Sequence, residues 1–97
     1  MMWFKVHKKG KSVLASVCSD DLLGKKLESK DQDLDINEHF FVGEKLELKD
    51  LKSVLTSYDN ITLVGNDIVD EAIRLGHIKE DNVQTIQGVK WIICLSE

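Results

Sequence analysis

The stretch Asn60–Asp67, which reads NITLVGND, decides the fold. Its four residues Ile-Thr-Leu-Val predict a strand of the buried type, because apolar and β-branched residues follow one another without alternation. The Gly-Asn-Asp that comes next predicts a turn into a helix, since Asn and Asp side chains accept hydrogen bonds from the free amides of a first helical turn. A buried strand therefore runs directly into a helix at this point of the chain.

The residues that follow complete a β-α-β unit. Gly76 predicts the end of the helix, and Val83–Ile86 predicts a second strand. Gln87-Gly88 predicts the two-residue turn of a hairpin with a last strand, Val89–Leu95. The apolar side of the helix consists of residues at helical spacing, namely Ile68, Val69, Ala72, Ile73 and Leu75.

Upstream of this unit, the pattern predicts a hairpin, a short helix and a longer helix. The hairpin joins Met2–His7 to Ser12–Cys18 around a short loop that contains Gly. The short helix begins at Ser19-Asp20-Asp21, and the longer one carries apolar residues along one face between Leu48 and Tyr58. Residues 25–33 are polar and predict a loop. The remaining predicted pieces are a strand beginning at residues 34–36 and a buried apolar knot at residues 40–43.

These elements predict one domain, residues 1–97, of the α+β or mixed α/β class. About six strands form a mixed sheet with two or three helices, N- and C-terminal hairpins and one β-α-β unit. The composition, 42% hydrophobic and 31% charged, is that of an ordinary globular protein. No apolar run reaches the ~20 residues that span a bilayer, and no charged segment precedes an apolar one at the N-terminus. We therefore expect a cytoplasmic protein without a membrane partner.

Positive charge is concentrated in the first third of the chain. The overall net charge of −4 argues against a protein that binds nucleic acid over its whole surface. Residues 1–30, however, hold seven lysines against three acidic residues, a net +4, whereas residues 31–97 hold six basic and fourteen acidic residues, a net −8. The candidate partner-binding residues are Lys8, Lys9, Lys11, Lys25 and Lys26. We interpret them either as one basic edge able to contact RNA phosphate or as a solvated edge that only keeps the protein soluble.

The alternative chemistry is nucleophilic catalysis by Cys18. His7 lies across the predicted N-terminal hairpin, and a predicted helix begins just after Cys18, which favours a thiolate. Asp20 and Asp21 oppose this, because neighbouring negative charge disfavours a thiolate. We therefore favour a packed cysteine. A bridge between Cys18 and Cys94 requires that their strands be neighbours, which the sequence leaves open.

Other candidate sites have weaker patterns. The three histidines are scattered without ligand spacing, so we expect no metal site and no cofactor. A strand that passes through Gly65 into a helix start is where anions bind, but Asp67 would repel a phosphate, so we expect a capped turn. Trp3 and Trp91 lie in the terminal hairpins, where an exposed face would support a homodimer.

Six different short motifs follow one another along nearly the whole chain. They are Trp3-Phe4-Lys5-Val6-His7, Val13-Leu14-Ala15 with Cys18, Leu22-Leu23-Gly24-Lys25, Phe40-Phe41-x-Gly43, Leu63-Val64-Gly65 and Val83-x-x-Ile86-x-Gly88-Val89. Their order and spacing resemble a small archaeal family known only as domain of unknown function 424. The resemblance implies an archaeal source and a single cytoplasmic domain, and it implies no activity.

The chain departs from that family pattern in its last hairpin. Family members often continue this hairpin as Val-Pro-His-Ala-Gln, whereas Val89 is followed here by Lys-Trp-Ile-Ile. If the His and Gln of that motif act on a ligand in family members, their absence here makes an enzyme less favoured. The resemblance also implies an association of such genes with translation factors. We therefore expect a non-catalytic binding module of the translation machinery, with an RNA or protein partner, and keep as the alternative a small enzyme that uses Cys18 with His7.

Overall fold

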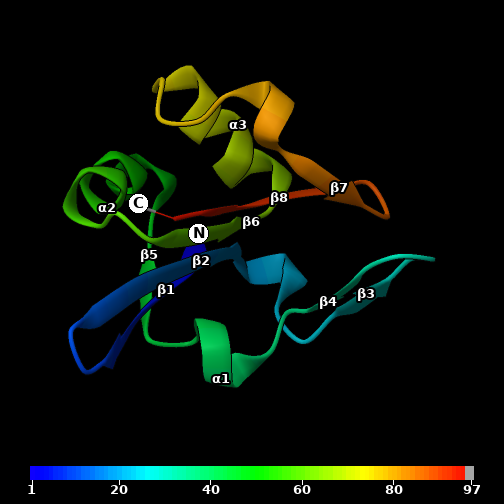
Figure 1. Cartoon of the computed structure of the whole chain (residues 1–97), viewed down its shortest axis with the longest axis horizontal. Coiled ribbons are helices and arrows are strands. Elements are labelled where there is room, and N and C mark those ends of the chain that lie inside the picture. The colour runs from blue at the N-terminus through cyan, green and yellow to red at the C-terminus, as the bar shows by residue number, and fades with distance from the viewer. Residues whose placement is uncertain (96–97) are drawn as a thin grey trace.

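The computed structural model describes residues 1–95 and contains a central six-stranded sheet with the strand order β5-β1-β2-β6-β8-β7. Helices α2 and α3 cover one face, and α1 with a small second sheet lies on the other (Figure 1). The central sheet consists of β1 (Met2–Lys9), β2 (Ser12–Ser19), β5 (Glu44–Leu46), β6 (Ile61–Val64), β7 (Gln84–Ile86) and β8 (Val89–Cys94).

The remaining elements connect these strands. The α-helices are α1 (Glu38–Phe41), α2 (Leu51–Ser57) and α3 (Asn66–Arg74). The 3-10 helices are η1 (Asp20–Leu22), η2 (Leu48–Asp50) and η3 (Glu80–Asn82). The second sheet pairs β3 (Lys26–Glu28) with β4 (Asp33–Asp35). The predicted α+β class, the mixed sheet of six strands and both terminal hairpins are confirmed.

The predicted β-α-β unit is β6–α3–β7, with one strand inserted in it. Both β6 and β7 pair antiparallel with β8, so they run parallel to each other on either side of it. Strand β8 pairs with β7 through the hairpin turn at Gln87 and Gly88, whose φ angles are 49° and 79°. Two positive φ angles in succession give a turn that folds β8 back beside β7. On its other side β8 pairs with β6, so it lies between the two parallel strands.

Two expectations about local structure are corrected. Residues 25–33, predicted as a loop, contain β3, which pairs with β4 and contributes the buried Leu27. The apolar knot at residues 40–43 includes the last two residues of α1, which begins after Asn37. The Asn37 side chain caps this helix by accepting a hydrogen bond from the Phe40 amide at 2.8 Å. Strand β3 was not predicted because only alternate side chains of a strand face the core, so most residues of this segment are polar.

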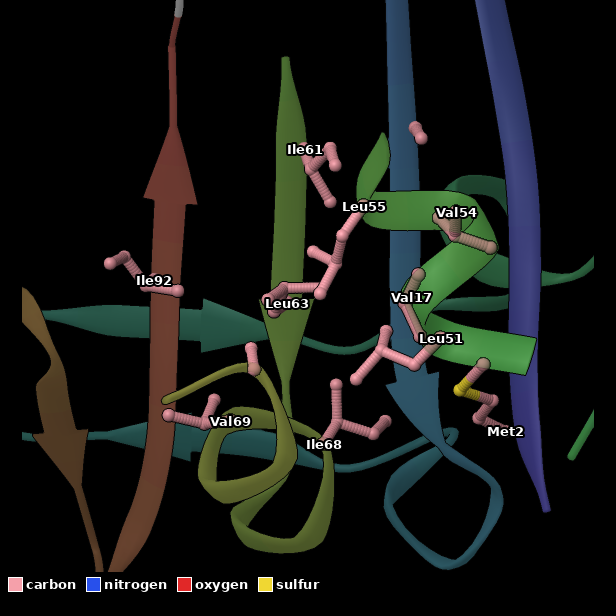
Figure 2. Close-up of a cluster of buried hydrophobic side chains, with 12 residues drawn as sticks. Met2, Val17, Leu51, Val54, Leu55, Ile61, Leu63, Ile68, Val69 and Ile92 are labelled. Atoms are coloured by element: carbon pink, nitrogen blue, oxygen red, sulfur yellow. The ribbon is translucent and has the colours of Figure 1, made fainter. Parts of the chain in front are cut away.

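The main core lies between the sheet and the two longer helices (Figure 2). Helix α2 contributes Leu51, Val54 and Leu55, and α3 contributes Ile68, Val69 and Ala72. The strands present every second side chain to this face, because neighbouring residues of a strand point to opposite sides. A second, smaller cluster on the other face contains Cys18, Leu27, Ile36, Phe41, Val64 and Ile86.

Candidate functional site

Three of the predicted lysines lie together at the tip of the β1–β2 hairpin. Lys8, Lys9 and Lys11 are exposed, and the hairpin projects at one end of the molecule (Figure 1). Within residues 1–95, the ion pairs involve none of these three lysines. No carboxylate of the described residues therefore offsets their positive charge through an ion pair.

Lys25 and Lys26 lie elsewhere, so the expected single basic edge is corrected to two separate groups. The hairpin tip precedes β2, whereas Lys25 and Lys26 come after it, and a strand of this length spans roughly 25 Å. Figure 1 shows the turn of the β1–β2 hairpin and the small β3–β4 sheet on opposite sides of the molecule. Lys26 pairs with Glu28 at 3.7 Å, and β4 across from it carries Asp33 and Asp35. Mixed charge at this second place weakens its attraction for an anion.

The structure brings Lys5 and Phe40, which sequence reasoning assigned to no site, to the face of the hairpin that holds His7 and Lys9. Lys5, His7 and Lys9 share one face of β1 because they are two residues apart, and α1 packs on this face. Lys5 Nζ donates to the His39 carbonyl of α1 at 2.6 Å. The Phe40 ring stacks on His7, with centroids 4.6 Å apart and an angle of 22° between the planes. An aromatic surface therefore adjoins the basic hairpin.

Two hydrogen bonds clamp the backbone of α1 to this hairpin. The Phe40 carbonyl accepts from the buried Ser16 hydroxyl at 2.6 Å and from His7 Nε2 at 2.8 Å. Because a carbonyl only accepts, the Nε2 atom carries its proton, which fixes the tautomer of a neutral His7. Phe40 is 33 residues away from His7, so no local sequence signal predicts this contact. The alternation of Lys5, His7 and Lys9 gave the only hint, by placing them on one face.

The surroundings of Cys18 favour a neutral thiol. The side chain is fully buried in the second core cluster. Burial raises the pKa of the Cys18 thiol to about 12, and the charges of Asp20 and Asp21 add to the rise. His7, the expected base, bonds to the Phe40 carbonyl and lies 3.3 Å from the Ser16 hydroxyl. These contacts give no support to the thiolate alternative.

The raised pKa predicts a loss of stability in alkali. Between pH about 9 and 12 the unfolded chain releases the Cys18 proton while the folded protein retains it, so the free energy of unfolding falls as the pH rises. Urea unfolding at pH 8 and pH 10 measures this slope, and Cys18→Ala should flatten it. Equal slopes in the two proteins would contradict the assignment.

Alkylation of native protein should modify Cys94 well before Cys18, which is fully buried.

The two cysteines are free and do not form a bridge. Strand β6 lies between β2, which carries Cys18, and β8, which carries Cys94. The two side chains also pack in different core clusters on opposite faces of the sheet. Burial raises the pKa of the Cys94 thiol as well. The strand order therefore shows that Cys18 and Cys94 are not on neighbouring strands, a question that their spacing in the sequence left open.

Both tryptophans pack within the chain. Trp3 and Trp91 are half-buried against the second core cluster, in one row of the sheet that passes through Cys18 and Val64. The Lys45 ammonium lies 5.0 Å from the centre of the Trp3 ring. A homodimer through these tryptophans stays a prediction.

A shallow cleft of about 290 Å³ opens where the parallel strands β2 and β6 end. Here the Ser19 hydroxyl donates to Asp67 Oδ1 at 2.6 Å, and the same oxygen accepts from the Ile68 amide at 2.9 Å. Asp67 and Asp21 make the cleft acidic, which opposes a phosphate. Residues 1–95 contain no group of three or more His, Cys, Asp or Glu placed to hold a metal ion. None of their helices has the length and apolar character needed to cross a membrane.

Comparison with known proteins gives a family and a fold. The family model described as "Protein of unknown function (DUF424)" matches residues 6–94. The crystal structure of an uncharacterized conserved protein from Methanopyrus kandleri is similar, with a TM-score of 0.75 and 24% identity over 99% of this chain and 94% of that one. No curated protein matches the chain. The similarity supports the fold and carries no activity with it.

Proposed function

This chain belongs to the DUF424 family of proteins of unknown function, and from that premise we propose that it is a non-catalytic module that binds RNA phosphate with the tip of its β1–β2 hairpin. The observation that carries the proposal is the group of Lys8, Lys9 and Lys11, exposed together without an ion pair among the described residues. Lysines that contact phosphates release counterions, and this release provides most of the non-specific affinity for nucleic acid.

The distribution of charge over the fold supports one basic end. Residues 66–82, which include α3 and η3, carry five acidic and two basic residues. This segment lies on the opposite side of the sheet from α1 (Figure 1). A polyanion would be repelled from the α3 side and attracted to the hairpin. The distribution of charge therefore both attracts the protein to RNA and turns its hairpin toward the RNA. Orientation explains how a protein of net charge −4 can bind RNA.

The partner that we propose is RNA of the translation machinery. The family resemblance, with its association with translation factors, motivates this choice. A protein partner at the same surface is the competing outcome, because acidic side chains would also pair with these lysines. Salt separates phosphate binding, which weakens steeply with ionic strength, from a protein partner held mainly by apolar packing, whose binding changes little.

Replacement of all three tip lysines by alanine should weaken binding to RNA by about 100-fold at 0.1 M salt, because each lost phosphate contact lowers the logarithm of the affinity by about 0.7 there. The salt slope should fall by about two for the same reason. Fluorescence anisotropy with a labelled RNA, repeated over a salt series, measures both. Co-sedimentation with ribosomal particles at low salt extends the test to the proposed partner.

The matched control removes the same charge from the α2–α3 side. Lys49→Ala, Lys52→Ala and Lys79→Ala together change three exposed lysines outside the hairpin and should alter the affinity by less than about threefold. No RNA binding by the unmodified protein at low salt would refute the proposal. Equal losses in the two triple variants would also refute it, since they would indicate an attraction that depends only on net charge. Salt-insensitive retention on ribosomal particles would favour a protein partner instead.

A further inference from the structure

We infer that the RNA bound at this hairpin is single-stranded and that one of its bases stacks on the aromatic pair His7–Phe40. The inference rests on the proposed function and deepens it. Lysines attract the phosphates of duplex and single strand alike, so they do not choose between them. A flat aromatic surface discriminates between single-stranded and duplex RNA, because only an unpaired base has a free face that can stack on it.

The His7–Phe40 pair has the position that such a role needs. The rings are stacked at 4.6 Å, and both side chains are half-buried, so each keeps part of its surface in solvent. Lys9 follows His7 on the same face of β1, about 7 Å further along the strand. Lys5 precedes it at the same spacing on the same face. The aromatic pair therefore lies between two positive charges on a line that leads to the hairpin tip.

The pair is also held rigidly before any ligand arrives. The Phe40 carbonyl is fixed by Ser16 and His7, and the Phe40 amide is fixed by the Asn37 side chain at 2.8 Å. Phe41, packed edge-on to Phe40 with centroids 5.0 Å apart, is buried in the second core cluster. A fixed platform loses little side-chain entropy when a base stacks on it, which favours binding.

Acidic groups beside this surface are few. On α1 the exposed Glu38 is the acidic residue, and on β5, which pairs with β1, Glu44 lies opposite Phe4.

Neighbouring residues of a strand alternate between its two sides, so Phe4 and His7 point to opposite faces of β1. Phe4 packs instead against Tyr58, with ring centroids 5.9 Å apart, in the main core. Phe4 therefore provides a control for Phe40.

The experiment compares Phe40→Leu with Phe4→Leu, two identical substitutions on opposite faces. Binding is measured by anisotropy with a ten-nucleotide oligouridylate and with a blunt RNA duplex. Phe40→Leu should weaken the single strand by about tenfold, the loss of one base–aromatic stack, and leave duplex affinity and the salt slope unchanged. Phe4→Leu should change neither RNA by more than about twofold. Thermal unfolding verifies that each variant is folded at the assay temperature.

A second measurement uses the unmodified protein and so does not depend on folding of a variant. A single strand that contains 2-aminopurine should lose fluorescence on binding, because stacking on an aromatic ring quenches this base. Unchanged fluorescence, or equal losses of duplex and single-strand binding in Phe40→Leu, would overturn the inference. If the triple lysine variant alone loses affinity, phosphate binding stands and stacking fails. If the unmodified protein binds neither RNA, the proposed function fails and stacking with it.

Discussion

Gly65→Ala should lower the free energy of unfolding by about 4 kcal/mol, through backbone strain of about 1–3 kcal/mol and overpacking of a similar size. Gly65 has φ 127° and ψ 139°, a combination that residues with a Cβ rarely adopt. A Cβ at this position would overlap the Ser19 hydroxyl and lie 3.1 Å from Ser19 Cβ. The site is buried between the ends of β2 and β6, so neither strand is free to move aside. Urea unfolding at pH 7 measures the loss.

Three further variants separate strain from overlap at this glycine. Gly88→Ala introduces a Cβ into open space at φ 79° and should cost only about 1 kcal/mol, the strain alone. Ser19→Ala removes the hydroxyl that the new Cβ would meet. The double variant Ser19→Ala with Gly65→Ala should therefore be more stable than the sum of the two single losses predicts. A loss below 1 kcal/mol in Gly65→Ala, or strict additivity in the double variant, would contradict this account.

Leu63→Ala should be similarly damaging, with a loss of about 3–5 kcal/mol. Leu63 is fully buried on β6, paired with Val17 of β2 on one side and Ile92 of β8 on the other. Figure 2 shows its side chain below Leu55 of α2. Because this strand has neighbours on both sides and a helix above it, the structure cannot close over the missing methyl groups. A domain of this size has about 5–15 kcal/mol of stability in total, so much of it would be lost.

Ile93→Ala is the matched control for this truncation. Ile93 lies on β8, next to Ile92, but its side chain points to the other face and is 51% exposed. Its replacement should cost less than about 1 kcal/mol, because the exposed half of the side chain gains nothing from burial. Thermal melts of the two variants give the comparison directly. Similar melting temperatures for Leu63→Ala and Ile93→Ala would mean that the main core does not lie between β6 and the helices.

The periodic patterns predicted most of the elements. The helix of residues 48–58 appears as η2 and α2, and the helix after Gly65 appears as α3. Both hairpins form at the glycine turns that predicted them. These successes share one cause: an amphipathic helix or a tight turn is specified by residues that are close in sequence. The strand β3 escaped prediction because three residues with one buried side chain are too short to show an alternation.

The candidate site was predictable only in part. The three tip lysines are neighbours in sequence, so their joint exposure on one turn followed from the hairpin alone. Lys25 and Lys26 were placed with them wrongly, because the direction taken by the chain after β2 is not written in the local pattern. The association of His7 with Phe40 joins residues 33 positions apart and depends on how α1 packs on the hairpin.

The sequence by itself determined the elements, the α+β class and the uneven division of charge, because each depends on composition or on neighbouring residues. Tertiary structure alone decided the strand order, which inserts β8 between β6 and β7 and keeps Cys18 apart from Cys94. It also separated the two groups of lysines and brought an aromatic ring to one of them. The physical reason is that such contacts join distant segments, and which segments meet depends on how every apolar face is buried at once.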